Sequence, residues 1–272
     1  MTSGIELALL PRVMAVLRSI GRNIPRFIQH PGRALRLLSR RMLPVRAMLG
    51  DPLAYHTVGS WTFGRLPRVD ITQAFPRIEE AEIVLVKPLG GDAETSVTPH
   101  EMAVLCAIVR STGAKRILEI GTFDGRTALN LAANAPADGL VTTVDLPADW
   151  NRGLALKVPH HAMNATSVLP SGLKYRDTPY APRVRQVYGD SAALDWSALG
   201  VPFDMVFIDG CHSYDYVMSD TLRALGSVRQ GGLVIWHDYG MIEDVSRVVD
   251  ETASRIQVRA IRSTSLAVGF VS

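Results

Sequence analysis

Arg116-Ile117-Leu118-Glu119-Ile120-Gly121-Thr122-Phe123-Asp124-Gly125-Arg126-Thr127 is the stretch of sequence that decides the fold. An apolar run that contains an acid near its end and is followed by two glycines is typical of a buried strand, a sharp turn and a helix that begins at once. The turn between a strand and its following helix is a common place for a nucleotide to bind. The stretch therefore predicts a nucleotide-binding α/β domain.

Predicted strands and helices alternate through residues 98–272. Thr98-Pro99-His100-Glu101 predicts a helix start, with the hydroxyl as cap, proline at the first position and glutamate at the third. Strands are expected at residues 116–120, 140–145, 184–188, 204–209, 233–236, 257–261 and 266–270, and helices at 98–111, 125–135, 217–228 and 241–255. This alternation predicts an α/β fold with a doubly wound, Rossmann-like, mostly parallel sheet that binds ligands at the carboxyl ends of its strands.

The first 50 residues differ in charge from the rest of the chain. They carry nine arginines, no lysine and one acid, a net charge of +8, so the total of +3 leaves −5 for the remainder. We predict a basic helical N-terminal extension at residues 1–50, a linker or lid at 51–97 with a short strand at 82–86, and the main domain at 98–272.

The basic extension is open to three interpretations. Residues 5–50 have the pattern of an amphipathic segment in peripheral contact with an anionic inner membrane, of a cap on the main domain, or of a surface for homo-oligomerisation. The acidic main domain gives no indication of nucleic-acid binding. Cys106 and Cys211 lack the spacing of a metal site, and no apolar run approaches the ~18 residues of a membrane span, so we expect a cytoplasmic protein.

Glu119 distinguishes between two classes of nucleotide-binding turn, one for a diphosphate and one for a cationic ligand. A nicotinamide-binding turn needs Gly-x-Gly-x-x-Gly, whose helix start receives a diphosphate. Here the pattern is Glu-x-Gly-x-x-x-Gly, and an acid at the first position suits a ligand with a cationic sulfonium and an amino group. Two more acids follow predicted strands: Asp145 suits ribose hydroxyls as an acceptor, and Asp190 suits the amino group of adenine.

With these three acids in this order, residues 98–272 resemble the class I S-adenosylmethionine (SAM)-dependent methyltransferases. The resemblance implies the seven-stranded sheet of that class and SAM as the cofactor. The residues predicted to bind the cofactor are Glu119, Gly121, Thr122, Gly125, Arg126, Thr127, Asp145, Asp190, Ser191 and Asp209.

Asp209 and Asp238 follow two consecutive predicted strands, so their carboxylates can face one crevice. Two carboxylates with open water positions make a site for a hard cation such as Mg²⁺, which would lower the pKa of a substrate hydroxyl. His212 lies three residues after Asp209, near enough to act as a general base. His237 is a second catalytic candidate, as a base, a metal ligand or a hydrogen-bonding wall.

The motifs Asp-Gly-x-His-x-Tyr at residues 209–214 and His237-Asp238 resemble the methyltransferase family 24 branch. Some of its members are metal-dependent O-methyltransferases that act on sugar hydroxyls of natural products. The resemblance implies metal ligands at Asp209 and Asp238 and a base at His212. The chain departs from this pattern at His237, where those relatives have glutamate.

The sequence therefore predicts a SAM-dependent methyltransferase that acts on a hydroxyl of a small molecule or glycoside, with assistance from a divalent metal and a histidine base. Two alternatives stay open. One is a metal-independent N- or O-methyltransferase, which would be indifferent to Mg²⁺. The other is a non-catalytic SAM-binding protein associated with a membrane, which would have no need of Asp209, His212 and Asp238 together.

Overall fold

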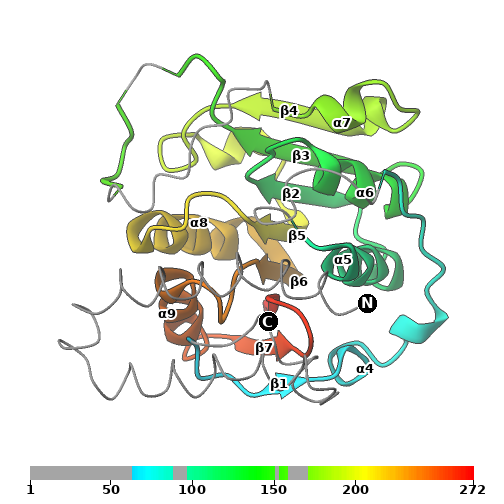
Figure 1. The fold of residues 1–272 in the computed structure, drawn as a ribbon, viewed down its shortest axis with the longest axis vertical. Helices are drawn as coiled ribbons and strands as arrows, with labels where there is room; N and C mark the ends of the chain where they lie inside the picture. Colours follow the sequence, from blue (N-terminus) through cyan, green and yellow to red (C-terminus); the bar gives the residue numbers. More distant parts are fainter. Residues whose placement is uncertain (1–62, 88–96, 151–152, 159–170) are drawn as a thin grey trace, which may run out of the picture. The chain divides into compact units, whose positions relative to one another are not determined.

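The computed structural model describes residues 63–87, 97–150, 153–158 and 171–272. Residues 63–272 form one compact unit. The predicted basic extension at residues 1–50, with its membrane contact, lies outside the described residues. Within the described ranges one eight-stranded sheet runs in the order β1-β7-β8-β6-β5-β2-β3-β4 (Figure 1). The strands are β1 (Arg68–Val69), β2 (Arg116–Ile120), β3 (Leu140–Asp145), β4 (Val184–Tyr188), β5 (Phe203–Ile208), β6 (Val228–Trp236), β7 (Gln257–Ile261) and β8 (Ala267–Phe270).

Neighbouring strands of this sheet are parallel except where β8 pairs with β6 and with β7. From β2 the chain moves outward through β3 and β4 on one side, and then returns to β5 and β6 on the other side. The predicted doubly wound, mostly parallel sheet is thus confirmed. In open sheets of this kind a ligand binds where the strand order reverses, which here is at the carboxyl ends of β2 and β5.

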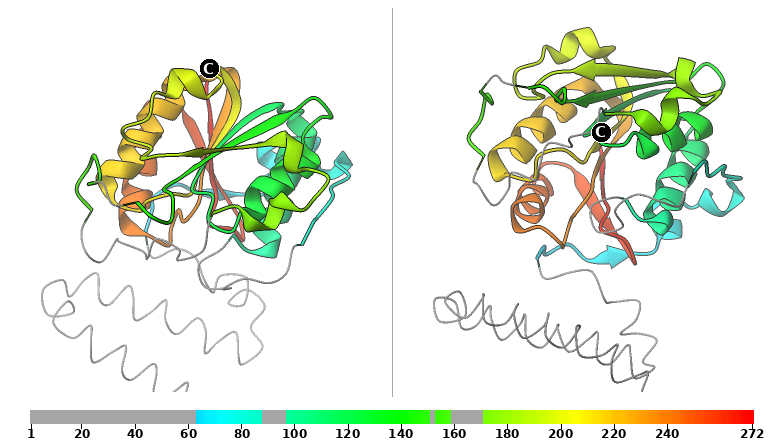
Figure 2. Two further views of the ribbon diagram at one scale, coloured as in Figure 1. Left: turned by 90° about the horizontal axis from the view of Figure 1, so that it is seen from above. Right: turned by 45° about the horizontal axis from the view of Figure 1, so that its top comes forward.

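Helices cover both faces of the sheet, as Figure 2 shows with the sheet seen nearly edge-on. One face carries α5 (Pro99–Thr112) and α6 (Arg126–Asn134), and the other carries α8 (Tyr214–Ser227) and α9 (Glu243–Thr252). Shorter elements are α4 (Ile71–Ala74), α7 (Leu173–Arg176) and single 3₁₀ turns at Ile78–Glu80, Ala181–Arg183 and Trp196–Leu199.

Strand β5 separates the two resulting cores. Met205 and Phe207 belong to the buried cluster that includes α5 and α6, whereas Val206 and Ile208 belong to the cluster that includes α8 and α9. Successive side chains of a strand point to opposite faces, so a strand covered on both faces must be apolar throughout. This is why the central strands can be recognised as continuous apolar runs.

The helix that Thr98 and Glu101 predict is confirmed as α5. The Thr98 hydroxyl accepts a hydrogen bond from the Glu101 N–H at 3.2 Å, and the Glu101 carboxylate accepts one from the Thr98 N–H at 3.0 Å. Gly113 ends the helix in the left-handed region, with φ of 65°. The predicted limits of β2, β3, β4 and β7 are also confirmed, and the other strands and helices differ by a few residues at their ends.

Two expectations for residues 51–97 differ from the structure. The segment predicted as a linker or lid adds an eighth strand, β1, to the seven expected, and it buries Phe75 and Ile78 in the core. The strand predicted at residues 82–86 is wrong. The backbone N–H and C=O groups of Val84 and Val86 instead pair with the side-chain amides of Asn134 and Asn130 on α6, at 2.7 to 3.0 Å.

The turn after β2 needs glycine because it lies against the turn after β5. Gly121 has a φ of 99°, and a Cβ at this position would lie 2.0 Å from the carbonyl oxygen of Asp209. Gly125 has a φ of 83°, and a Cβ there would lie 2.6 Å from the Cα of Gly172. The two predicted glycines therefore allow close approaches of backbone to backbone that any side chain would prevent.

We predict that Gly121→Ala lowers the free energy of unfolding by at least about 3 kcal/mol, because it combines backbone strain with a contact that the β5 turn cannot relieve. Urea unfolding followed by circular dichroism measures the effect. Gly226→Ala is the matched control, since Gly226 lies in α8 with no atom near its would-be Cβ. We expect this control to be neutral or to stabilise by up to about 1 kcal/mol. Equal stability of Gly121→Ala and the parent protein would contradict the account.

Candidate functional site

Glu119 is fully buried near the carboxyl end of β2. The Thr143 hydroxyl donates to its Oε2, whereas Oε1 has no hydrogen-bond partner among the residues that the structure describes. Burial is the largest cause that raises the pKa of this carboxyl well above its ordinary value, and the negative charges of Asp209 and Asp145 add to the shift. An unsatisfied acceptor in acidic surroundings is the place where a cationic hydrogen-bond donor would be stabilised most.

Asp145 joins the end of β3 to the glycine turn. Its Oδ2 accepts hydrogen bonds from the Phe123 N–H and the Ser171 hydroxyl, both at 2.9 Å, and its Oδ1 accepts one from the Leu146 N–H at 2.8 Å. Phe123 adopts a left-handed φ of 47° to direct its N–H to this carboxylate. The carboxylate is partly exposed, so it keeps acceptor capacity for a ligand.

Asp190 follows β4 and is buried. Its Oδ2 accepts from the Tyr216 hydroxyl and from the Ala155 N–H, both at 2.7 Å, and its Oδ1 accepts from the Ala192 N–H at 3.0 Å. Ser191 beside it is buried as well. The three acids predicted to contact the cofactor therefore do lie at the ends of the adjacent strands β2, β3 and β4.

The polar side chains of the glycine turn face the protein. The Thr122 hydroxyl lies 2.7 Å from the Thr143 hydroxyl, beneath the turn. The Arg126 side chain is buried and donates to the carbonyl oxygen of Val97 at 3.1 Å. Thr127 is half-buried on the first turn of α6. Cofactor contacts by Thr122, Arg126 and Thr127 stay predictions, and the bonds given above for the Thr122 and Arg126 side chains are to other parts of the protein.

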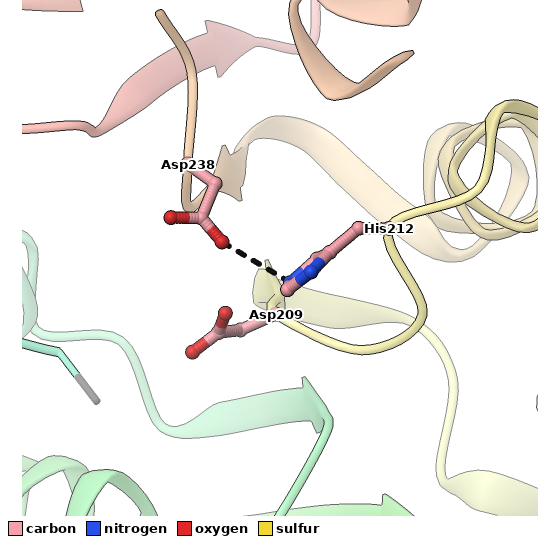
Figure 3. Close-up of side chains that lie close together, drawn as sticks. All are labelled: Asp209, His212 and Asp238. Atoms are coloured by element: carbon pink, nitrogen blue, oxygen red, sulfur yellow. Dashed lines mark ion pairs between the residues drawn. The ribbon is translucent and has the colours of Figure 1, made fainter. Parts of the chain in front are cut away.

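Asp209, His212 and Asp238 come together at the ends of β5 and β6, where their side chains point toward one another (Figure 3). Each offers one ligand atom, and these atoms lie within 4.8 Å of one another. His212 Nε2 is 3.1 Å from Asp238 Oδ2. Burial disfavours the charged imidazole, but the bond to Asp238 outweighs it and raises the pKa of His212. The two carboxylates fit a divalent cation as ligands, with the imidazole of His212 beside them.

His237 lies among three carboxylates. Its Nδ1 is 3.1 Å from Asp209 Oδ1 and 3.4 Å from Asp238 Oδ1, and its Nε2 is 3.4 Å from Glu101 Oε2. The ring is buried, and burial alone would lower its pKa, but the carboxylates raise the pKa of His237 well above its ordinary value. The surrounding carboxylates therefore favour the protonated imidazole, whose positive charge would offset part of the acidic cluster.

Glu101 is a site residue that the sequence assigned only to a helix cap. Beyond its bonds to Thr98, its Oε1 accepts from the N–H and hydroxyl of Ser265, at 2.7 and 2.8 Å. Burial opposes its ionisation, yet His237 and the backbone donors lower the pKa of Glu101 to about 2. In the sequence, the helix cap with Thr98 is a sufficient explanation for Glu101. Its partner in the site, His237, lies 136 residues further along the chain.

Asp220 on α8 is a second residue that the sequence analysis missed. It is fully buried, and no described residue makes a hydrogen bond of good geometry to either carboxylate oxygen, although Ser191 lies near enough to lower its pKa. Burial is the largest cause that raises its pKa to about 7, and the nearby charge of Asp190 adds to the shift. A signal was present, because Asp220 shares the buried face of α8 with Val217, Thr221 and Ala224.

The comparisons with known proteins agree with this geometry. Residues 118–239 match the family model described as a methyltransferase domain, of the family 24 type. A Mycolicibacterium vanbaalenii protein provisionally named an O-methyltransferase is 26% identical over 171 residues, which cover 62% of this chain and 66% of that protein. A Mycobacterium tuberculosis protein with a similarly provisional name is 27% identical over 172 residues, with the same two coverages. The matches thus span slightly less than two thirds of these relatives.

Among solved structures, the O-methyltransferase TomG from Streptomyces achromogenes, in complex with SAM, is similar with a TM-score of 0.50 at 20% identity. The similarity covers 76% of this chain and 92% of that one. The fold is therefore that of the class I SAM-dependent methyltransferases. Residues 118–239, which carry the cofactor turn and the Asp209, His212 and Asp238 cluster, are the part of the chain that matches the methyltransferase domain of the family 24 type.

None of the helices in the described ranges is both long and apolar enough to cross a membrane. The same residues hold two cysteines, Cys106 and Cys211, and both are free thiols.

We predict that Asp220→Asn makes the protein more stable at pH 8 but not at pH 4. A carboxyl whose pKa is raised to about 7 in the folded state contributes stability that is complete below its unfolded value and is lost as the pH rises through 7. The loss amounts to about 1.4 kcal/mol per pH unit between the two pKa values. Asparagine has the same shape without the charge, so urea unfolding of the variant should lack this decline.

Asp215→Asn is the control for this comparison, because Asp215 lies on the same helix and is exposed. Its pH profile of stability should follow that of the parent protein. An Asp220→Asn profile parallel to the parent's between pH 4 and pH 8 would show that Asp220 is already ionised without cost in the folded protein.

Proposed function

We propose that this protein is a SAM-dependent O-methyltransferase that acts on a hydroxyl group of a small molecule or glycoside. The observation that supports it most is the close approach of the two turns that follow β2 and β5. Gly121 lies directly against the backbone of Asp209, so the turn expected to hold the cofactor and the cluster of Asp209, His212 and Asp238 share one edge of the sheet. A methyl donor and an activated acceptor must meet at such a place.

The acids at the ends of β2, β3 and β4 fit SAM in chemical type. Glu119 Oε1 has no hydrogen-bond partner in the described part of the chain, and it suits the cationic ammonium group of the cofactor. Asp145 suits the ribose hydroxyls and Asp190 the adenine amino group, each as a hydrogen-bond acceptor. When bound, SAM supplies an electrophilic methyl group on sulfur, and the residues of the protein bind, orient and deprotonate around it.

His212 is the residue we propose as general base. Its Nε2 is held 3.1 Å from Asp238 Oδ2, which fixes the orientation of the ring and favours the protonated form once a proton has been taken. The arrangement of a base oriented by a carboxylate is common to many enzymes that activate a hydroxyl nucleophile. His237 is less suited to this role, because both of its ring nitrogens already lie near carboxylates.

Asp209 and Asp238 are proposed to hold a divalent cation such as Mg²⁺, which would supply Lewis acidity toward the acceptor hydroxyl. A metal-independent methyltransferase is the second candidate, and His237 is the observation that favours it. The imidazolium already contacts Asp209 Oδ1 and Asp238 Oδ1, so it supplies positive charge where a metal would.

The free thiols Cys106 and Cys211 support the cytoplasm as the compartment. Peripheral membrane contact through residues 5–50 stays a prediction.

We predict that Asp145→Ala weakens binding of S-adenosylhomocysteine (SAH) by about 10- to 100-fold, because a carboxylate that accepts from hydroxyls contributes charge-assisted hydrogen bonds. Isothermal titration calorimetry measures the affinity. Asp138→Ala is the control, since Asp138 is exposed and forms a surface ion pair with Lys115. Unchanged binding by Asp145→Ala, or the absence of SAH binding by the parent protein, would remove the proposed cofactor site.

We predict that the protein binds one Mn²⁺ as a probe of the divalent site, and that Asp209→Asn abolishes this binding because it removes one of two carboxylate ligands. Electron paramagnetic resonance of Mn²⁺ measures it without knowledge of the acceptor. Methyl transfer from labelled SAM to a panel of phenols, catechols and glycosides, with and without a chelator, is the companion assay. Turnover that survives the chelator and is lost in His212→Ala would establish the metal-independent candidate instead.

A further inference from the structure

A chain of side chains, buried except for the half-buried Gln186, runs from α7 to Glu119 beneath the glycine turn. The Tyr175 hydroxyl donates to Gln186 Oε1 at 2.8 Å, and Gln186 Nε2 donates to the Thr122 hydroxyl at 2.9 Å. The Thr122 and Thr143 hydroxyl oxygens lie 2.7 Å apart, and the Thr143 hydroxyl donates to Glu119 Oε2. Five side chains from four elements and one turn are thus joined by four consecutive hydrogen bonds.

The register of the sheet places three of these residues side by side. Glu119 on β2 is paired with Thr143 on β3, and Thr143 is in turn paired with Gln186 on β4. Residues in the same register point to the same face of a sheet. Their side chains therefore form a row across three strands, on the face that Tyr175 also packs against.

With Glu119 ionised, as it would be opposite a cationic ligand, the direction of every hydrogen bond in this chain can be assigned. Gln186 Nε2 also lies 3.3 and 3.4 Å from the carbonyl oxygens of Thr143 and Val187, which can only accept, so the nitrogen and not the oxygen of the amide is on that side. Thr122 accepts from this nitrogen, which leaves its own proton for the neighbouring hydroxyl. Thr143 receives that proton in a hydrogen bond and gives its own to the carboxylate of Glu119.

All four donors consequently point toward Glu119. A carboxylate can only accept, so a chain of donors that ends on one of its oxygens stabilises the ionised form and fixes the plane of the group. Thr122 and Thr143 are buried, which strengthens each bond and excludes water as a substitute donor. The second oxygen, Oε1, has no partner among the described residues.

We propose that Thr143, Thr122 and Gln186 are positioning residues that hold the Glu119 carboxylate with one oxygen bound and the other presented to the ammonium group of an amino-acid ligand. This inference rests on the proposed function, in which SAM is the ligand. It assigns to these side chains a specific part of the affinity, the part that recognises the amino-acid portion of the cofactor. The contribution of the adenosine portion, at Asp145 and Asp190, is independent of them.

The experiment compares two ligands in one set of variants by calorimetry. SAH carries the ammonium group, whereas methylthioadenosine has the same adenosine and sulfur and lacks the amino-acid part. Thr143→Val removes the donor to Glu119 with little change in shape. We expect it to weaken SAH binding on the order of 10-fold and to change methylthioadenosine binding by less than about 2-fold.

Three further variants make the result specific. Thr142→Val is the matched control, because Thr142 is the buried neighbour on β3 whose hydroxyl bonds instead to the carbonyl oxygen of Leu199. It should leave both affinities unchanged. Thr143→Ser keeps the hydroxyl and should restore SAH binding. Gln186→Leu removes an earlier donor and should weaken SAH binding more than methylthioadenosine binding even if Thr143→Val does not fold.

The outcomes separate this inference from the proposed function. Equal losses for both ligands in Thr143→Val and Gln186→Leu, or no loss in either variant, would overturn the positioning role while leaving SAM binding in place. Failure of the parent protein to bind SAH at all would overturn the proposed function itself. A loss confined to SAH, with rescue by Thr143→Ser, is the result that the oriented chain requires.

Discussion

The contact between Gly121 and the backbone of Asp209 is the constraint on which the site depends. It occurs where the strand order reverses, between β2 and β5, and it tolerates no side chain because a Cβ would lie 2.0 Å from the Asp209 carbonyl oxygen. The two turns can therefore approach each other this closely only because residue 121 is a glycine. One turn carries the glycines of the cofactor site and the other carries Asp209 and His212. In open α/β sheets ligands bind where the strand order reverses, and here the contact between Gly121 and Asp209 is the reason at atomic level.

A second constraint follows from the acids that this approach concentrates. Glu119, Asp145, Asp209 and Asp238 all come after or at the ends of parallel strands, so like charges gather at one edge of the sheet. Such a cluster is stable only if cations or hydrogen-bond donors balance it. His237 offsets the negative charge at the ends of β5 and β6, whereas at the end of β2 one Glu119 oxygen has no partner within the ranges that the structure describes. The imbalance favours a cationic ligand on the β2 side.

The sequence predicted those parts of the fold that depend on continuous local patterns. The limits of β5 follow within one residue from an apolar run covered on both faces, and the start of α5 follows from the reciprocal bonds of Thr98 and Glu101. It could not predict pairings between distant polar residues. Nothing local indicates that Glu101 meets His237, or that Asn130 replaces a strand partner for Val86. These contacts depend on how the helices dock, which the periodicity of one segment does not specify.

The replacement of an acid by His237 bears directly on whether a metal can bind. The imidazolium uses the Oδ1 atoms of Asp209 and Asp238, while Asp238 Oδ2 faces His212, so the two histidines engage different oxygens. A cation could therefore share the carboxylates with His237, which would then orient them as an outer partner. The net charge of the cluster is less favourable for binding a cation than it would be with a third carboxylate, because the positive His237 stands in place of a negative residue. Glu101 reduces this penalty because it gives His237 an anion of its own, and the carboxylates of Asp209 and Asp238 keep more of their charge for a ligand.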